Sequence, residues 1–101
     1  MIERDADRLT VRSAMTFAEA VRLRDVIVQA IDRDGLTVDL GAVTEADSTA
    51  LSLMLEWQRA AKERGWRIAF ANLPDNMRSL AEVYGVLELI SLADSSAASA
   101  A

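Results

Sequence analysis

The sequence contains no cysteine and no histidine. Without cysteine, neither a disulfide framework nor thiolate chemistry is available. Without histidine, the usual general base near neutral pH and the commonest transition-metal ligand are also missing. We therefore expect no metal site and no cofactor, and we predict that the protein is not an enzyme.

Phosphate-binding loops and long apolar runs are missing as well. The four glycines are isolated from one another, which excludes the Walker and dinucleotide-binding turns. No stretch approaches the roughly 20 apolar residues that span a bilayer. Residues 1–5 carry charges with no apolar run behind them, so they do not form a secretory signal. We expect a cytoplasmic protein that does not insert into a membrane.

Basic residues are too few and too scattered for a nucleic-acid interface. The formal net charge is −5, and phosphate backbones are bound by clustered lysine and arginine. Carboxylates are the remaining catalytic groups, and Asp39, Glu45 and Asp47 lie close together in the sequence. Strand alternation directs Asp39 away from its apolar neighbours and Glu45 is solvated, so a catalytic pair is the weaker interpretation.

The sequence does contain alternating strand and helix patterns. We expect a hairpin of strands over 1–5 and 9–13, a helix from 16 to a glycine stop at 35, a strand over 36–40, a helix over 47–64, a strand over 66–70 and a helix that ends before Gly85. Strands that alternate with helices predict a two-layer α/β sandwich with a largely parallel sheet. We expect one domain over 1–92 and a flexible Ala/Ser-rich tail over 93–101.

The first helix carries a capping-box pattern, in which Thr16 and Glu19 would satisfy the free amides at its start. Its apolar residues recur at helical spacing: Phe17, Ala20, Val21, Val28 and Ile31. The third helix is predicted from apolar residues at positions i, i+3, i+4 and i+7: Met77, Leu80, Ala81 and Tyr84.

The second helix has more apolar surface than one buried face requires. Leu53 and Trp57 widen its apolar arc beyond half of the circumference. Either the first helix packs against this additional surface, or Leu53 and Trp57 reach the solvent and form a docking site.

The same helix begins with Asp47, Ser48 and Thr49. A helix start presents unpaired amides and the positive end of the helix dipole, so an added phosphate would be tolerated there. Such a phosphate would repel an acidic or apolar partner, which makes the segment a candidate switch. The alternative is that Asp47 or Ser48 serves only as the helix cap.

Four segments together resemble the signature of STAS domains, the family that includes the anti-anti-sigma factors. The segments are VDLGAV at 38–43, the pair Asp47-Ser48 with Leu51, FANL at 70–73, and VYGV at 83–86. The resemblance implies the STAS fold, with a mostly parallel sheet of four to five strands and three to four helices. The family often has glycine soon after the hydroxyl residue, whereas this chain has Thr49-Ala50.

The resemblance also implies a role in binding another protein. Ser48 matches the regulatory and sometimes phosphorylated hydroxyl of the family. Residues 78–86 are most similar to the stand-alone STAS subunit of the Mla phospholipid transporter, which maintains outer-membrane lipid asymmetry. That branch implies an ABC-transporter ATPase as partner and a location at the inner membrane through the complex. The alternative branch is an anti-anti-sigma factor that binds a kinase-like anti-sigma factor. The residues expected at the interface are Asp47, Ser48, Thr49, Ser52, Leu53 and Glu56.

Overall fold

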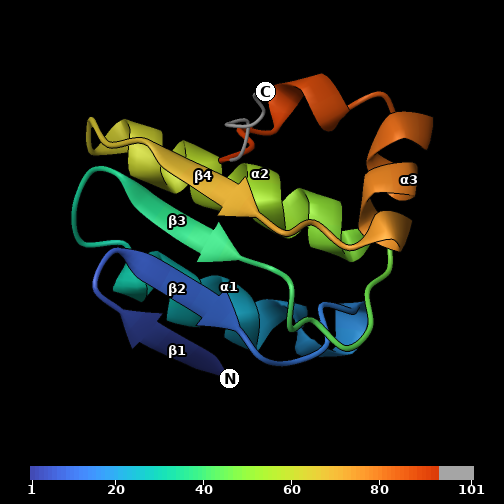
Figure 1. Cartoon of the computed structure of the whole chain (residues 1–101), viewed down its shortest axis with the longest axis horizontal. Coiled ribbons are helices and arrows are strands. Elements are labelled where there is room, and N and C mark those ends of the chain that lie inside the picture. The colour runs from blue at the N-terminus through green and yellow to red at the C-terminus, as the bar shows by residue number, and fades with distance from the viewer. Residues whose placement is uncertain (94–101) are drawn as a thin grey trace.

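The computed structural model describes residues 1–93, and Figure 1 shows their arrangement. Strands and helices follow one another as β1 (Ile2–Asp5), β2 (Arg8–Val11), η1 (Phe17–Glu19), α1 (Ala20–Ala30), β3 (Leu36–Asp39), α2 (Thr49–Glu63), β4 (Ile68–Ala71), α3 (Asp75–Val83) and η2 (Leu87–Leu89). The segments η1 and η2 are single 3₁₀ turns. Four strands and three α-helices agree with the α/β architecture expected from the sequence.

The four strands form one sheet in the order β1-β2-β3-β4. β1 and β2 form the expected antiparallel hairpin, whereas β2, β3 and β4 run parallel to one another. After η2 the chain returns to the free edge of β4, where the amide of Ala93 donates to the carbonyl of Phe70 at 2.8 Å. The tail expected over 93–101 is therefore hydrogen-bonded at its first residue, and its other residues lie outside the described part of the chain.

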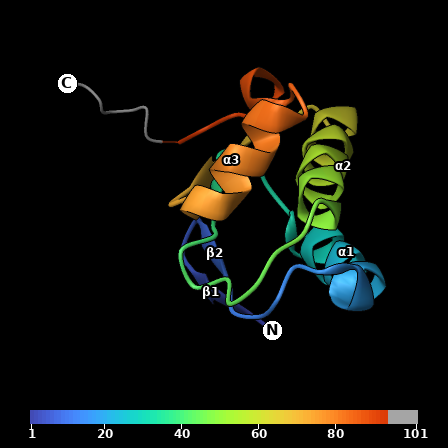
Figure 2. The same cartoon turned by 90° about the vertical axis from the view of Figure 1, so that its right-hand side faces the viewer.

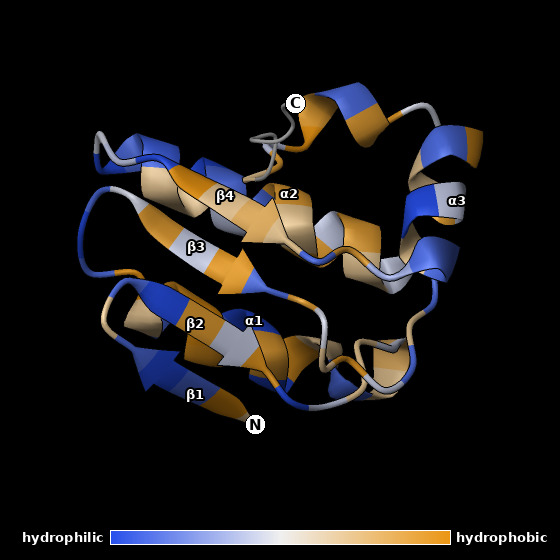
Figure 3. Cartoon of the chain, in the orientation of Figure 1, coloured by the Kyte–Doolittle hydropathy of each residue, from blue (hydrophilic) through white to orange (hydrophobic). Residues whose placement is uncertain are grey.

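Helices α1 and α2 cover one face of the sheet (Figures 1 and 2). Alternate strand residues point into this layer because successive side chains of a strand face opposite sides. The inward residues of β2, β3 and β4 are all buried: Leu9, Val11, Leu36, Val38, Ile68 and Phe70. Figure 3 shows the contrast between the apolar β4 at one side of the sheet and the mostly hydrophilic β1 at the other.

The two alternatives for the wide apolar arc of α2 are resolved by burial. Trp57 is 0% exposed and stacks on Phe70, with ring centroids 6.4 Å apart. Leu53 is 4% exposed, and α2 packs against α1. The docking surface proposed for Leu53 and Trp57 is therefore wrong, because α1 and the sheet together bury both side chains.

The start of the first helix also differs from expectation. The Thr16 side chain makes no capping hydrogen bond, and η1 precedes α1. Because a 3₁₀ turn has three residues rather than 3.6, it shifts the phase of the side chains. The buried face follows Leu23, Ile27 and Ile31, whereas Phe17 is 80% exposed and Val21 is 65% exposed.

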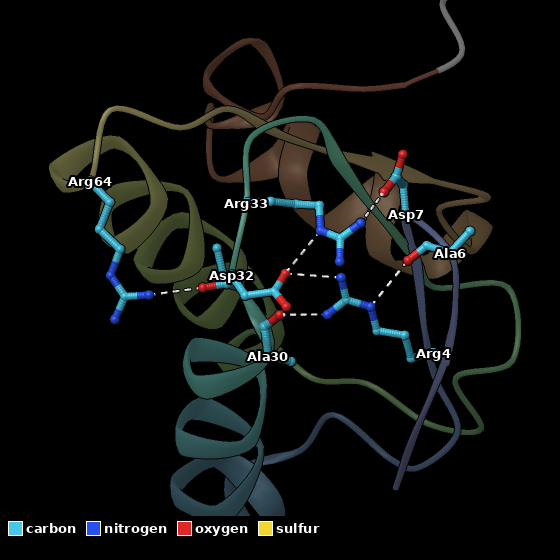
Figure 4. Close-up of polar contacts among 8 residues, drawn as sticks. Arg4, Ala6, Asp7, Ala30, Asp32, Arg33 and Arg64 are labelled. Atoms are coloured by element: carbon cyan, nitrogen blue, oxygen red, sulfur yellow. Dashed lines mark hydrogen bonds and ion pairs between the residues drawn. The ribbon is translucent and has the colours of Figure 1, made fainter.

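Arginine side chains close the opposite end of α1 (Figure 4). Arg4 donates to the carbonyl of Ala30 at 3.0 Å, and Arg64 donates to the carbonyl of Ile31 at 2.8 Å. These carbonyls belong to the last turn of the helix, where no intrahelical donor is available. Arg4 also pairs with Asp32 at 2.9 Å. We call this region, at the carboxyl end of α1, the arginine-clamped end.

Candidate functional site

Asp47 joins the starts of two helices. Its Oδ1 accepts from the amide of Thr49 at 2.9 Å, and its Oδ2 accepts from the amide of Phe17 at 3.1 Å. Ser48 already has helical dihedral angles, with φ −64° and ψ −18°, so Asp47 stands in the capping position of α2. The same carboxylate replaces the expected Thr16 cap and fixes the start of α1 beside the start of α2.

The hydrogen bonds around Asp47 favour its charged form. The amide of Phe17 lowers the pKa of this carboxyl most, burial opposes the shift, and the amide and hydroxyl of Thr49 lower the pKa further. The net direction is below the ordinary pKa. Asp47 is consequently ionised at neutral pH and places a negative charge where the helix dipole is positive.

The two neighbouring hydroxyls have different surroundings. Thr49 is half-buried, and its amide donates to Asp47. Ser48 is exposed and makes no side-chain capping bond. Ser52, one helical turn further along, is exposed as well. The structure therefore leaves Ser48 and Ser52 accessible to a kinase or a partner, while Thr49 supports the fold.

A hollow of about 370 Å³ lies beside these serines. It separates the first turns of α2 from the segment that follows α3. Its lining combines two hydroxyls with apolar side chains: Ser48, Leu51, Ser52, Leu55, Tyr84 and Val86. We call this feature the serine hollow. It is large enough to admit one or two side chains of another protein.

Exposed apolar residues lie on both sides of the start of α2. Phe17, which is 80% exposed, donates its backbone amide to Asp47 at this helix start. Tyr84, which is 58% exposed, lines the serine hollow. Figure 2 looks onto this side of the molecule, with the start of α1 below α2 and with α3 beside α2. We call the surface formed by Phe17, Ser48, Ser52 and Tyr84 the hydroxyl end.

The structure brings together four of the six residues expected at the interface. Asp47, Ser48, Thr49 and Ser52 lie at the start of α2. Leu53 is the correction, because its side chain is inside the core and no partner can contact it. Glu56 lies apart from the serine hollow: it lines the groove between α1 and α2 and is 3.8 Å from Arg24.

Two aromatic residues at the hydroxyl end are not among the residues expected at the interface. Phe17 and Tyr84 occupy apolar positions of helical patterns, yet both are more than half exposed. Tyr84 follows the last residue of α3, where the chain leaves the helix before Gly85. Its position directly before a helix-ending glycine was the available signal that the ring need not face the core.

Asp39 has a structural environment rather than a catalytic one. It accepts from the amide of Gly41 at 2.8 Å and from Asn72 Nδ2 at 3.1 Å, and it pairs with Arg8 at 2.9 Å. Burial raises its pKa, but the Gly41 amide, Asn72 and Arg8 together outweigh burial and lower the pKa. A Cβ on Gly41 would lie 3.1 Å from Asn72 Cβ and 3.1 Å from Asp39 Oδ1, so a larger residue would crowd this cluster.

The carboxylates near the α2 start do not gather into a metal-binding cluster. Across residues 1–93, no group of three acidic side chains is arranged to hold a metal ion. Asp39 and Asp47 each bind separate sets of partners, which gives no support to a catalytic pair. In the same part of the chain, no helix has both the length and the hydropathy needed to cross a membrane.

Comparison with known proteins identifies the family. The family model described as "Mlab, STAS domain" matches residues 1–91. No curated protein sequence matches closely enough to count as a relative.

Three solved structures have a similar fold. A candidate anti-sigma factor antagonist from Thermotoga maritima has a TM-score of 0.70 at 9% identity, over 91% of this chain and 83% of that one. The anti-sigma factor antagonist SpoIIAA in its unphosphorylated form has a TM-score of 0.65 at 15% identity, over 91% and 84%. The STAS domain of a SulP transporter from Vibrio cholerae has a TM-score of 0.54 at 17% identity, over 88% and 72%. Identities this low show a shared fold.

Proposed function

Because this chain belongs to the STAS domain family, in the group described as Mlab, we propose that it is a non-catalytic subunit that docks on the ATPase of an ABC-type phospholipid transporter. The hydroxyl end is the docking surface, with Ser48 and Ser52 at its centre. In this role the protein regulates or stabilises the ATPase, lies in the cytoplasm and reaches the inner membrane through the complex. It forms one domain over residues 1–92.

The observation that carries the proposal is the accessible Ser48 at a helix start that is already capped by Asp47. The cap leaves the Ser48 hydroxyl free for a partner, and exposed apolar side chains flank it. Aromatic residues at the centre of an interface supply much of the binding energy in protein complexes. Phe17 and Tyr84 are suited to this role because both are more than half exposed.

A second candidate is supported by the same serine. In an anti-anti-sigma factor, phosphorylation of Ser48 by a kinase-like anti-sigma factor would switch binding off. The exposure of Ser48 and the fold shared with SpoIIAA favour this candidate. The partner distinguishes the two functions: an ABC ATPase supports the first, and an anti-sigma kinase supports the second.

Co-purification from the native host tests the proposal directly. The tagged protein should elute with an ABC-transporter ATPase, identified by mass spectrometry. Ser48→Asp should keep the melting temperature, because a helix start accepts negative charge, and should weaken binding of the ATPase by about 1–3 kcal/mol.

Ser79→Asp is the matched control, because Ser79 is an exposed serine of α3 that does not line the serine hollow. It should leave ATPase binding unchanged. Recovery of an anti-sigma kinase instead of an ATPase would replace the first function with the second. Equal binding by Ser48→Asp and the unaltered protein would remove Ser48 from the interface.

A further inference from the structure

A second hollow lies next to the serine hollow. It measures about 550 Å³ and lies between the end of α3 and the segment that returns to β4. Its lining is apolar except for two glutamates: Glu82, Gly85, Leu87, Glu88, Ile90 and Leu92. We call it the glutamate hollow. Its size corresponds to one or two large side chains, and nothing in residues 1–93 fills it.

Three exposed apolar residues are sequence neighbours of the residues that line this hollow. Val83 is 79% exposed and Leu89 is 59% exposed, and Tyr84 lies between them in the sequence. These three residues are half of the large apolar side chains that are exposed among the described residues. An apolar surface of this kind, rimmed by polar groups, is typical of a protein interaction site.

The two glutamates of the hollow have no cationic partner. Glu82 and Glu88 are exposed, and neither forms an ion pair within residues 1–93. Some acidic residues elsewhere have such partners, as in Asp7 with Arg33 and Asp34 with Arg67. Others, such as Glu45 and Glu63, form no ion pair among the described residues either. Two unpaired carboxylates beside an apolar floor are complementary to a basic group that adjoins an apolar side chain.

The glutamate hollow adjoins the hydroxyl end along the chain. Tyr84 and Val86 line the serine hollow, whereas Gly85 and Leu87 line the glutamate hollow. The four residues 84–87 therefore form one chain segment whose residues alternately line the two hollows. A partner that covers Ser48 and Tyr84 needs to extend by only a few residues to reach Glu82 and Glu88.

We propose that the glutamate hollow binds a segment of the partner protein in which leucine-like side chains alternate with lysine or arginine. This inference rests on the proposed function, because it treats the two hollows as one interface. The apolar side chain enters between Leu87, Ile90 and Leu92. The basic side chains pair with Glu82 and Glu88 at the rim, and the net charge of −5 attracts such a segment over longer distances.

A defined peptide tests the inference without knowledge of the partner. We would titrate the ¹⁵N-labelled protein with acetyl-KLLKLLK-amide and follow the amide resonances by NMR. The largest shifts should fall on Gly85, Leu87 and Glu88. The peptide acetyl-ELLELLE-amide is the control, and it should cause no comparable shifts.

Charge reversal separates specific pairing from general attraction to an acidic protein. The double variant Glu82→Lys/Glu88→Lys should weaken binding of the basic peptide about tenfold, and 0.5 M salt should weaken binding to the unaltered protein. The single variant Glu63→Lys is the control, because Glu63 is an exposed glutamate of α2 that does not line the hollow. Equal weakening by Glu63→Lys and by either rim variant, Glu82→Lys or Glu88→Lys, would overturn the inference.

Two further outcomes would also overturn it. If truncation after Ala93 shifts the same amides without peptide, the C-terminal residues of this chain occupy the hollow. If the resonances move on dilution, a second copy of the chain occupies it. The peptide assay does not use Ser48, so Ser48→Asp should bind the peptide normally. The peptide assay therefore tests the glutamate hollow alone, whereas co-purification tests docking on the ATPase.

Discussion

The free backbone groups at the two ends of the helical layer have different hydrogen-bond partners: arginine side chains at one end and a carboxylate at the other. At the arginine-clamped end, Arg4 and Arg64 reach across from other elements to the last carbonyls of α1. At the hydroxyl end, the single carboxylate of Asp47 accepts from the amide of Phe17 in η1, which leads into α1, and from the amide of Thr49 in α2. The first end uses its polar side chains for the fold. The second relies on the carboxylate of Asp47 and leaves the Ser48 hydroxyl and two aromatic side chains exposed.

Removal of the Asp47 carboxylate should have the largest effect on this comparison. Asp47→Ala leaves the amides of Phe17 and Thr49 without their acceptor, so we expect the free energy of unfolding to fall by about 2–3 kcal/mol. Urea denaturation followed by circular dichroism measures the change. Asp47→Asn is the control, since it keeps one acceptor oxygen and should lose less stability than alanine. No loss with alanine would mean that the two helix starts are held by other contacts.

Acid should remove the stability that Asp39 and Asp47 contribute to the fold. The folded-state pKa values of Asp39 and Asp47 lie below their ordinary value, which is about 3.9 in an unfolded chain. Each group therefore contributes stability above pH 4, and this contribution is lost as the pH falls through 4 towards the lowered pKa. The melting temperature should decrease over that range.

Asp39→Asn tests the acid prediction. The variant should lose about 1–2 kcal/mol at pH 7, because asparagine gives up charged hydrogen bonds to Arg8 and Gly41. Its melting temperature should depend less on pH between 5 and 3 than that of the unaltered protein. Parallel pH profiles of the two proteins would show that Asp39 does not contribute to acid sensitivity.

A single ion pair at the arginine-clamped end should matter least. Arg33 and Asp7 are 3.1 Å apart, but both side chains are more than half exposed. Exposed pairs contribute little because water screens them. Asp7→Ala should change the free energy of unfolding by less than about 0.5 kcal/mol and should leave ATPase binding unchanged. A larger loss would mean that the clamp acts as a connected network.

The sequence was sufficient to predict the alternation of strands and helices and the parallel sheet. Strands such as β3 are short and rich in branched residues, and glycines end the helices, so local patterns define these elements. The pattern could not place Phe17, because its surroundings depend on Asp47, which is 30 residues away. A carboxylate contributed by a distant segment leaves no periodic signal.

The start of α2 could be predicted as a candidate site, but its division of roles could not. Ser48 and Thr49 are chemically similar neighbours, and only the fold directs one outward and the other towards Asp47. The burial of Leu53 likewise depends on how α1 packs against α2, which the sequence of α2 alone does not determine. The predicted interface is therefore wrong in including this core residue, and its location at the start of α2 stays a prediction.

Site-specific crosslinking tests the central claim most directly. A photo-crosslinking amino acid in place of Ser52 at the hydroxyl end, and separately in place of Asp7 at the arginine-clamped end, would be activated in the native host. We predict that position 52 forms an adduct with an ABC-transporter ATPase and that position 7 forms none. An ATPase adduct from position 7 without one from position 52 would contradict the account.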